Sequence, residues 1–156
     1  MGFPAQVSCS SDSRHVLDRA YREIGRGRLR EAIEVLERSV ETGAGSTAVR
    51  TLLGIAYART RQVQRAFEHF ECAVAIDPQA FAPRCALGEL YISLCIFDEA
   101  RRHLERALAC ASDADERSYA QKLLREGRMR ERQRVHRPSF RQPAFAGFAG
   151  RATESR

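Results

Sequence analysis

The sequence has no tryptophan, one lysine and no long hydrophobic run. No stretch approaches the roughly 18 consecutive apolar residues that span a bilayer, so we expect no membrane segment. Residues 1–13 lack a basic start followed by an apolar core, which disfavours a secretory signal. These absences favour a soluble, cytoplasmic protein.

Cysteine occurs five times, an odd number, and without a CxxC pair. Secreted disulfide scaffolds use an even number of cysteines at close spacing, so a disulfide framework is not expected. We interpret most of these residues as small, buried apolar side chains. They are Cys9, Cys72, Cys85, Cys95 and Cys110.

The signatures of common catalytic sites are missing too. The chain has no Walker-type phosphate loop and no GxGxxG, GxSxG or HExxH pattern. His69 and Cys72 lie one helical turn apart, but a zinc site needs about three or four protein ligands. A Cys–His nucleophile pair meets only in space and therefore stays open from sequence. We predict a protein that is not an enzyme and that holds no metal and no cofactor.

The positive charge is unevenly placed along the chain. The net charge is +6, and residues 125–156 hold nine of the 26 basic residues but three of the 20 acidic ones. From about residue 133 the composition turns to Arg, Pro, Gly and Phe without periodicity, which is typical of a disordered segment. We therefore predict a basic disordered tail over 133–156 and a flexible N-terminus over 1–12.

What is present is an internal repeat of 34 residues. Residues 47–80 align on 81–114 without a gap and match at 11 positions. The first of these copies carries Leu53-Gly54-x-x-Tyr57, then Ala66-x-x-x-Phe70, Ala73 and Asp77-Pro78. The second carries Leu87-Gly88-x-x-Tyr91, then Ala100-x-x-x-Leu104 and Ala107.

These motifs resemble the tetratricopeptide repeat family, in which each repeat is a pair of antiparallel helices. Arg50 and Arg84 depart from the family pattern, because an aromatic residue is expected there, and Ser112 replaces the proline. A fainter copy over 13–46 has Glu23 where tyrosine is expected. It retains Ala20, Gly27, Leu29, Ala32, Leu36 and Ser39.

The resemblance implies an all-α fold, a right-handed α-α superhelix of about three helical hairpins with a C-terminal capping helix. We expect a domain over 13–132 with repeats at 13–46, 47–80 and 81–114 and a capping helix at about 114–132, since a repeat stack needs a polar outer end. Apolar spacing and turn residues place the helices. They are expected near 14–25, 29–42, 47–60, 63–76, 81–94 and 97–110.

The family also implies a concave groove lined by the first helix of each repeat. Carried over position by position, its peptide-binding residues are Leu17, Tyr21, Ile24, Thr51, Ile55, Ala58, Arg59, Cys85, Glu89, Ile92 and Ser93. Some family members clamp a chaperone's C-terminal carboxylate with lysine, asparagine and arginine. Leu17, Tyr21, Ile55, Ala82 and Ala86 stand at those positions here, so we expect an apolar peptide or amphipathic helix instead. The alternative is that several of these residues pack against the neighbouring repeat.

Two functions follow from these patterns. The first is a protein–protein interaction module, an adaptor or chaperone-like holder with a protein or peptide partner. The second is a nucleic-acid-associated factor that uses the arginine-rich tail, where Phe140, Phe145 and Phe148 are interleaved with arginine. That tail could equally dock into the groove or be an inert extension. Self-association is compatible with so short an array.

Arginines also gather at the turns within the first two repeats. Arg26, Arg28 and Arg30 could form a ridge with Arg59, Arg61 and Arg65 that contacts an acidic partner or nucleic acid. The simpler interpretation is that nearby glutamates on the second helices balance them.

Overall fold

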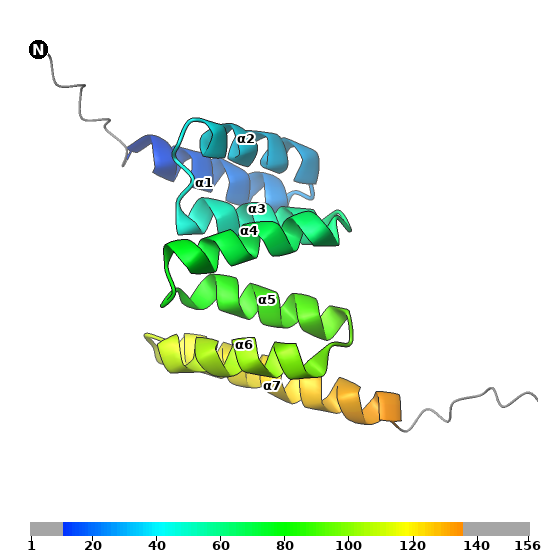
Figure 1. The fold of residues 1–156 in the computed structure, drawn as a ribbon. Coiled ribbons are helices and arrows are strands. Elements are labelled where there is room, and N and C mark those ends of the chain that lie inside the picture. Colours follow the sequence, from blue (N-terminus) through cyan, green and yellow to red (C-terminus); the bar gives the residue numbers. More distant parts are fainter. Residues whose placement is uncertain (1–10, 136–156) are drawn as a thin grey trace, which may run out of the picture.

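The computed structural model describes residues 11–135, and this part of the chain is a stack of antiparallel helices without strands (Figure 1). The chain runs from one end of the stack to the other, from α1 to α7. The helices are α1 Ser11–Gly25, α2 Leu29–Glu41, α3 Thr47–Arg59, α4 Val63–Ile76, α5 Phe81–Ser93, α6 Phe97–Cys110 and α7 Ala114–Val135.

The expected all-α class is confirmed, and the six hairpin helices lie where sequence spacing places them except at the start of α1. The two ends differ. α1 begins at Ser11 rather than near residue 14, and α7 continues to Val135, three residues beyond the expected end. The last turn of α7 is held because the Arg134 guanidinium donates to the Cys95 carbonyl oxygen at 3.1 Å. The remainder of the expected tail and most of the expected N-terminal segment lie outside the described residues.

The turn inside each hairpin repeats with the 34-residue period. Gly27, Arg61 and Cys95 take positive φ values of 77°, 65° and 60°. The next residue then donates its N–H to the carbonyl five positions earlier, for example Gln62 to Tyr57 at 2.9 Å, which closes the helix end. Glycine adopts this conformation freely, whereas Arg61 and Cys95 adopt it at a cost of about 1 kcal/mol each.

Close packing within each of the last two hairpins depends on one glycine. A Cβ added to Gly54 would lie 2.5 Å from the Phe70 ring, and one added to Gly88 would lie 2.5 Å from Leu104 Cγ. Phe70 and Leu104 are almost fully buried. The small residue in α3 or α5 therefore lets the large one in α4 or α6 enter the helix interface.

The helices form two layers. α1 contacts α3, α3 contacts α5 and α5 contacts α7, so the odd-numbered helices lie side by side. α2, α4 and α6 each pack on the preceding odd-numbered helix. The buried side chains form one cluster from α1 to α5 and a second among α5, α6 and α7. This order leaves one face of the odd-numbered layer free to carry a site.

α7 closes the stack. Ala120 and Leu123 are buried in the second core cluster. Its N-terminus is capped, because Asp113 Oδ1 accepts from the Glu116 backbone N–H at 2.8 Å. No helix in residues 11–135 combines the length and apolar character that a membrane crossing requires.

Candidate functional site

Two adjoining hollows run along the odd-numbered layer. The larger is about 500 Å³ and the smaller about 420 Å³. Both are lined by Ile55 of α3, Ala86 and Glu89 of α5, and Tyr119 of α7. Because they share these four residues, the hollows form one continuous groove, which we call the concave groove.

Most of the expected groove residues meet there. Tyr21, Thr51, Ile55, Cys85 and Glu89 line the larger hollow. The smaller hollow adds residues from the last turns of α3 and α5, namely Ala58, Arg59 and Ser93. The remainder of the larger hollow is mainly apolar. It is formed by Thr47, Ala48, Leu52, Ala80, Phe81, Ala82, Pro83, Ala86, Glu116 and Tyr119.

Three expected groove residues lie elsewhere. Ile24 and Ile92 are buried, with 8% and 3% of their surface exposed, and each belongs to a core cluster. Ile92 faces Gly127, where an added Cβ would be 3.5 Å away, so it packs against α7. Leu17 is partly buried against the first core cluster and lines neither hollow. Ile92 therefore packs against the helix that follows its repeat, as the alternative interpretation proposed, whereas Ile24 and Leu17 belong to the core side of α1.

Two lining residues come from the capping helix and were not expected. Glu116 and Tyr119 lie 34 residues after Ala82 and Cys85, so they take the second and fifth positions of a fourth first helix. Extending the 34-residue register into α7 would have found both. The groove therefore spans four helices, from Tyr21 of α1 to Tyr119 of α7.

Polar contacts fix the C-terminal wall of the groove, which is formed by Glu89, Glu116 and Tyr119. The Tyr119 hydroxyl donates to the Glu89 carboxylate, which joins α7 to α5. Burial, and then the bond to Glu89, raise the pKa of Tyr119, so it stays a neutral donor. The Glu116 carboxylate accepts from the Ser112 backbone N–H at 2.8 Å and from its hydroxyl at 2.9 Å. Among the described lining residues, this wall is acidic and Arg59 is the one base.

Cys85 in the groove wall is a poor nucleophile. Burial, reinforced by the charges of Glu89 and Glu116, raises its pKa to about 12. The side chain is therefore a neutral thiol at physiological pH. Within residues 11–135, no group of three or more His, Cys, Asp or Glu side chains is arranged to hold a metal ion.

Each of the last two hairpins contains a stacked tyrosine–histidine pair. The ring centroids of Tyr57 and His69 are 5.4 Å apart, and so are those of Tyr91 and His103. The Nδ1 atoms of His69 and His103 are buried, and no described group bonds to them. Burial lowers the pKa of both histidines, and nearby Arg50 and Arg84, respectively, add to the effect.

This depressed pKa predicts acid sensitivity. Between about pH 7 and 5.5 the histidines of the unfolded chain, with a pKa near 6.5, bind protons more readily than those of the folded protein. The free energy of unfolding therefore decreases as the pH is lowered through this range. Denaturant unfolding across that window should show a weaker pH dependence for His69→Gln/His103→Gln than for the wild type. His15→Gln, at an exposed position on α1, is the control and should follow the wild type. Equal pH dependence in the double variant and the wild type would contradict the assignment.

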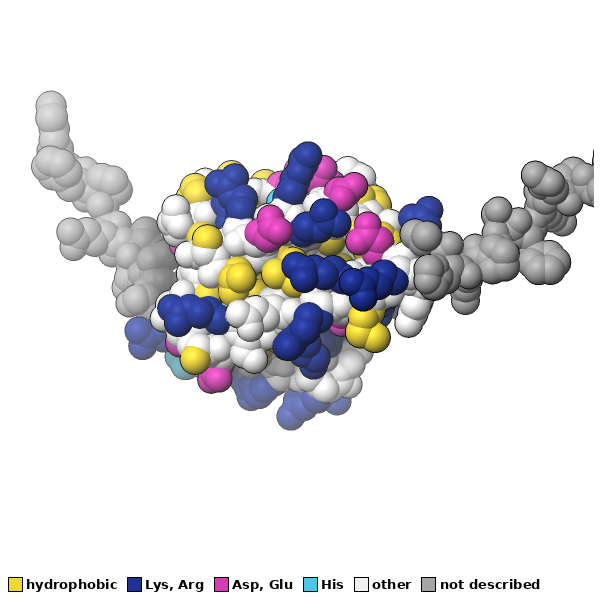
Figure 2. Space-filling view, turned by 90° about the horizontal axis from the view of Figure 1, so that it is seen from below, with side chains coloured by type: hydrophobic (Ala, Val, Ile, Leu, Met, Phe, Trp, Pro, Cys, Tyr) yellow, Lys and Arg dark blue, Asp and Glu magenta, His cyan; other side chains and the backbone are white. Residues whose placement is uncertain are grey.

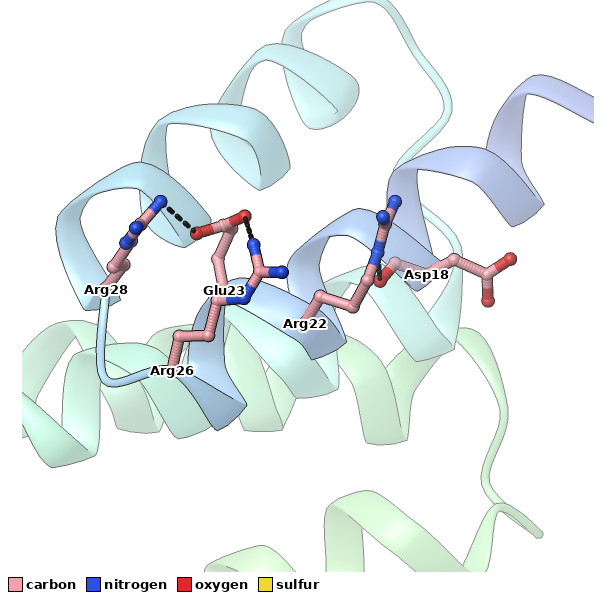
Figure 3. Close-up of polar contacts among 5 residues, drawn as sticks. All are labelled: Asp18, Arg22, Glu23, Arg26 and Arg28. Carbon is pink, nitrogen blue, oxygen red and sulfur yellow. Dashed lines mark hydrogen bonds and ion pairs between the residues drawn. The ribbon is translucent and has the colours of Figure 1, made fainter.

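Three of the six arginines at the turns contact side chains of their own repeat. In Figure 3, Arg26 and Arg28 both approach the Glu23 carboxylate, at 3.4 and 3.6 Å. The Arg65 guanidinium lies 5.4 Å from the centre of the Tyr57 ring. For Arg26 and Arg28 this favours local charge balance over a basic ridge, with Glu23 of the first helix in place of the second-helix glutamates that were expected.

The family follows from a match that covers half of the chain. A tetratricopeptide repeat model matches residues 59–136, which is 78 of the 156 residues. The chain belongs to the tetratricopeptide repeat family. No curated protein matches it in sequence.

Solved structures share the fold at low sequence identity. The Sgt2 TPR domain from Aspergillus fumigatus has a TM-score of 0.71 and 16% identity, covering 95% of this chain and 98% of that one. The first TPR of Spaghetti (RPAP3), bound to HSP90 peptide SRMEEVD, has a TM-score of 0.66 and 20% identity over 77% and 93%. A MamA RS-1 double mutant has a TM-score of 0.65 and 21% identity over 81% and 69%. These similarities establish the fold.

Proposed function

We propose that the concave groove binds an apolar peptide or amphipathic helix of a partner protein, so that the chain acts as an adaptor or chaperone-like holder. The observation that carries this proposal is the continuous hollow along α1, α3, α5 and α7, which is lined mainly by apolar side chains. The two hollows, of about 500 and 420 Å³, each lie within the range of about 300–1,000 Å³ that is typical of ligand sites. Helix-in-groove recognition uses such a surface to bury the apolar stripe of a helix.

The groove is ill suited to an acidic C-terminal peptide. One similar structure holds the peptide SRMEEVD. In this chain the positions that would carry a carboxylate clamp are occupied by Leu17, Tyr21, Ile55, Ala82 and Ala86. Glu89 and Glu116 would also repel an acidic ligand at the C-terminal wall. The partner segment should therefore be apolar, and any charge that it places at this wall should be positive.

Replacing Ile55 with Glu should abolish partner capture and leave the fold intact. Ile55 lines both hollows, and it is half-buried at the surface rather than within the core. A carboxylate there would have to lose its water when an apolar segment binds, at a cost of about 2–5 kcal/mol or more, which is a loss of affinity of at least roughly 30-fold. The measurement is an affinity pull-down with mass spectrometry, followed by titration of the identified partner segment.

Ile76→Glu is the matched control, because Ile76 is a large apolar residue of α4 with 52% of its surface exposed and lines neither hollow. It should retain capture. Circular dichroism and thermal melting should show both variants folded. Equal capture by the wild type and Ile55→Glu would remove the groove as the binding site.

A further inference from the structure

The outer face of α7 carries a row of basic side chains that the groove does not use. Lys122, Arg125, Arg128 and Arg132 are all exposed. They recur at intervals of three and four residues, so they share one side of the helix. We call these four residues the α7 basic face. Figure 2 looks onto the end of the stack where α7 lies and shows Lys and Arg side chains spread over this surface.

Three of the four acidic residues of α7 are engaged away from this face, and the fourth, Asp115, lies in the first turn, seven residues before Lys122. Glu126 pairs with Arg130 at 2.7 Å, and Glu131 pairs with Arg101 of α6 at 3.5 Å. Glu116 turns toward the groove. Among residues 11–135, none of the four side chains of the α7 basic face takes part in an ion pair. A capping helix needs a polar outer side, but that side does not need to carry charges of only one sign.

We propose that the α7 basic face binds the phosphate backbone of nucleic acid without reading its sequence. The four charges extend over about 15 Å of helix axis, and a nucleic-acid strand carries a phosphate about every 3.4 Å. A row of this length can therefore contact several phosphates. Arginine forms paired hydrogen bonds with phosphate oxygens, and three of the four residues are arginine.

The composition of the face favours nucleic acid over a membrane. Met129 is the large apolar residue exposed beside the row, with 61% of its surface exposed, and no aromatic side chain lies among the four positions. A membrane-surface helix needs an apolar face to insert, whereas the apolar side of α7 is buried in the second core cluster. The same lack of aromatic residues excludes base stacking at this face and leaves contacts to the backbone.

The test is fluorescence anisotropy of a labelled short DNA duplex of mixed sequence, titrated with the full chain at several salt concentrations. In the α7 variant the four residues of the basic face become glutamine. The matched control changes Arg14, Arg19, Arg22 and Arg30 to glutamine, which removes the same charge from exposed positions on α1 and α2. Both variants keep residues 136–156, so any contribution from that segment is common to both. Circular dichroism checks that they fold.

The α7 variant should bind the duplex about 100-fold more weakly at low salt, and its slope of log K against log salt should shrink by about 3–4. The control should keep the affinity within about threefold of the wild type and leave the slope unchanged. Equal losses in the two variants, or unchanged binding by the α7 variant, would overturn the proposal. The proposal would also be overturned if the α7 variant lost binding to phosphatidylserine vesicles or to an acidic protein but bound DNA as the wild type does.

Discussion

Replacing Gly54 or Gly88 with alanine should destabilise the fold by about 2 kcal/mol each. The added Cβ would lie 2.5 Å from the Phe70 ring or from Leu104 Cγ, and neither atom is the free end of a flexible chain. Such overpacking costs up to about 3 kcal/mol, offset by about 1 kcal/mol of helix propensity gained by alanine. Denaturant unfolding of the two single variants and of the double variant measures the effect. The double variant should melt about 10 °C lower.

Gly127→Ala is the matched control for this effect. It is also a buried helical glycine, but its added Cβ would lie 3.5 Å from Ile92, an ordinary contact distance. The substitution should leave the fold as stable or raise the free energy of unfolding by up to about 1 kcal/mol. If all three substitutions shift stability in the same direction, helix propensity rather than close approach of the helices governs these positions.

Replacing Phe70 with alanine should have the largest effect of any single substitution described here. The side chain is 1% exposed and packs against Gly54 in the α3–α4 interface. Truncation of such a residue costs about 3–5 kcal/mol because it loses buried area and leaves a cavity. The measurement is the free energy of unfolding from urea titration at neutral pH.

The same variant tests the cause of the glycine effect. In the Phe70→Ala background the ring atoms that the added methyl group would strike are gone, so Gly54→Ala should become neutral or stabilising by about 1 kcal/mol. The coupling between the two sites is then about 2–3 kcal/mol. In a Phe67→Ala background Gly54→Ala should keep its full cost, since Phe67 instead packs its ring 4.9 Å from that of Tyr91. An unchanged cost in all three backgrounds would show that Phe70 is not the obstacle.

The sequence predicts the helices well because the pattern that specifies them is local. The 34-residue period places Gly54 and Gly88 opposite Phe70 and Leu104, and the structure has these pairs in contact. The period does not reveal where a hydrogen bond to a distant residue stabilises the end of a helix. α7 extends to Val135 partly because Arg134 bonds to Cys95, a residue 39 positions earlier.

The groove is less predictable because a helix position does not determine how deeply a side chain is buried. Ile55 and Ile92 both belong to first helices and both were expected to face the groove. Ile55 lines the groove, whereas Ile92 is buried against α7. Tyr119 of the capping helix was not among the expected groove residues, yet it forms the end wall through its bond to Glu89. The position of Tyr119 follows from extending the 34-residue register into α7, but the burial of Ile92 depends on which helix covers it, which the repeat pattern does not encode.

The most direct test of groove binding is an NMR titration of the isotope-labelled full chain with a synthetic peptide of the captured partner segment. The proposal predicts amide shift changes concentrated on α3, α5 and the first turns of α7, with Ile55, Ala86, Glu89 and Tyr119 among the most affected residues. The outer sides of α4 and α6 should change little. Shift changes centred on those outer sides, with the groove residues unaffected, would contradict the proposal.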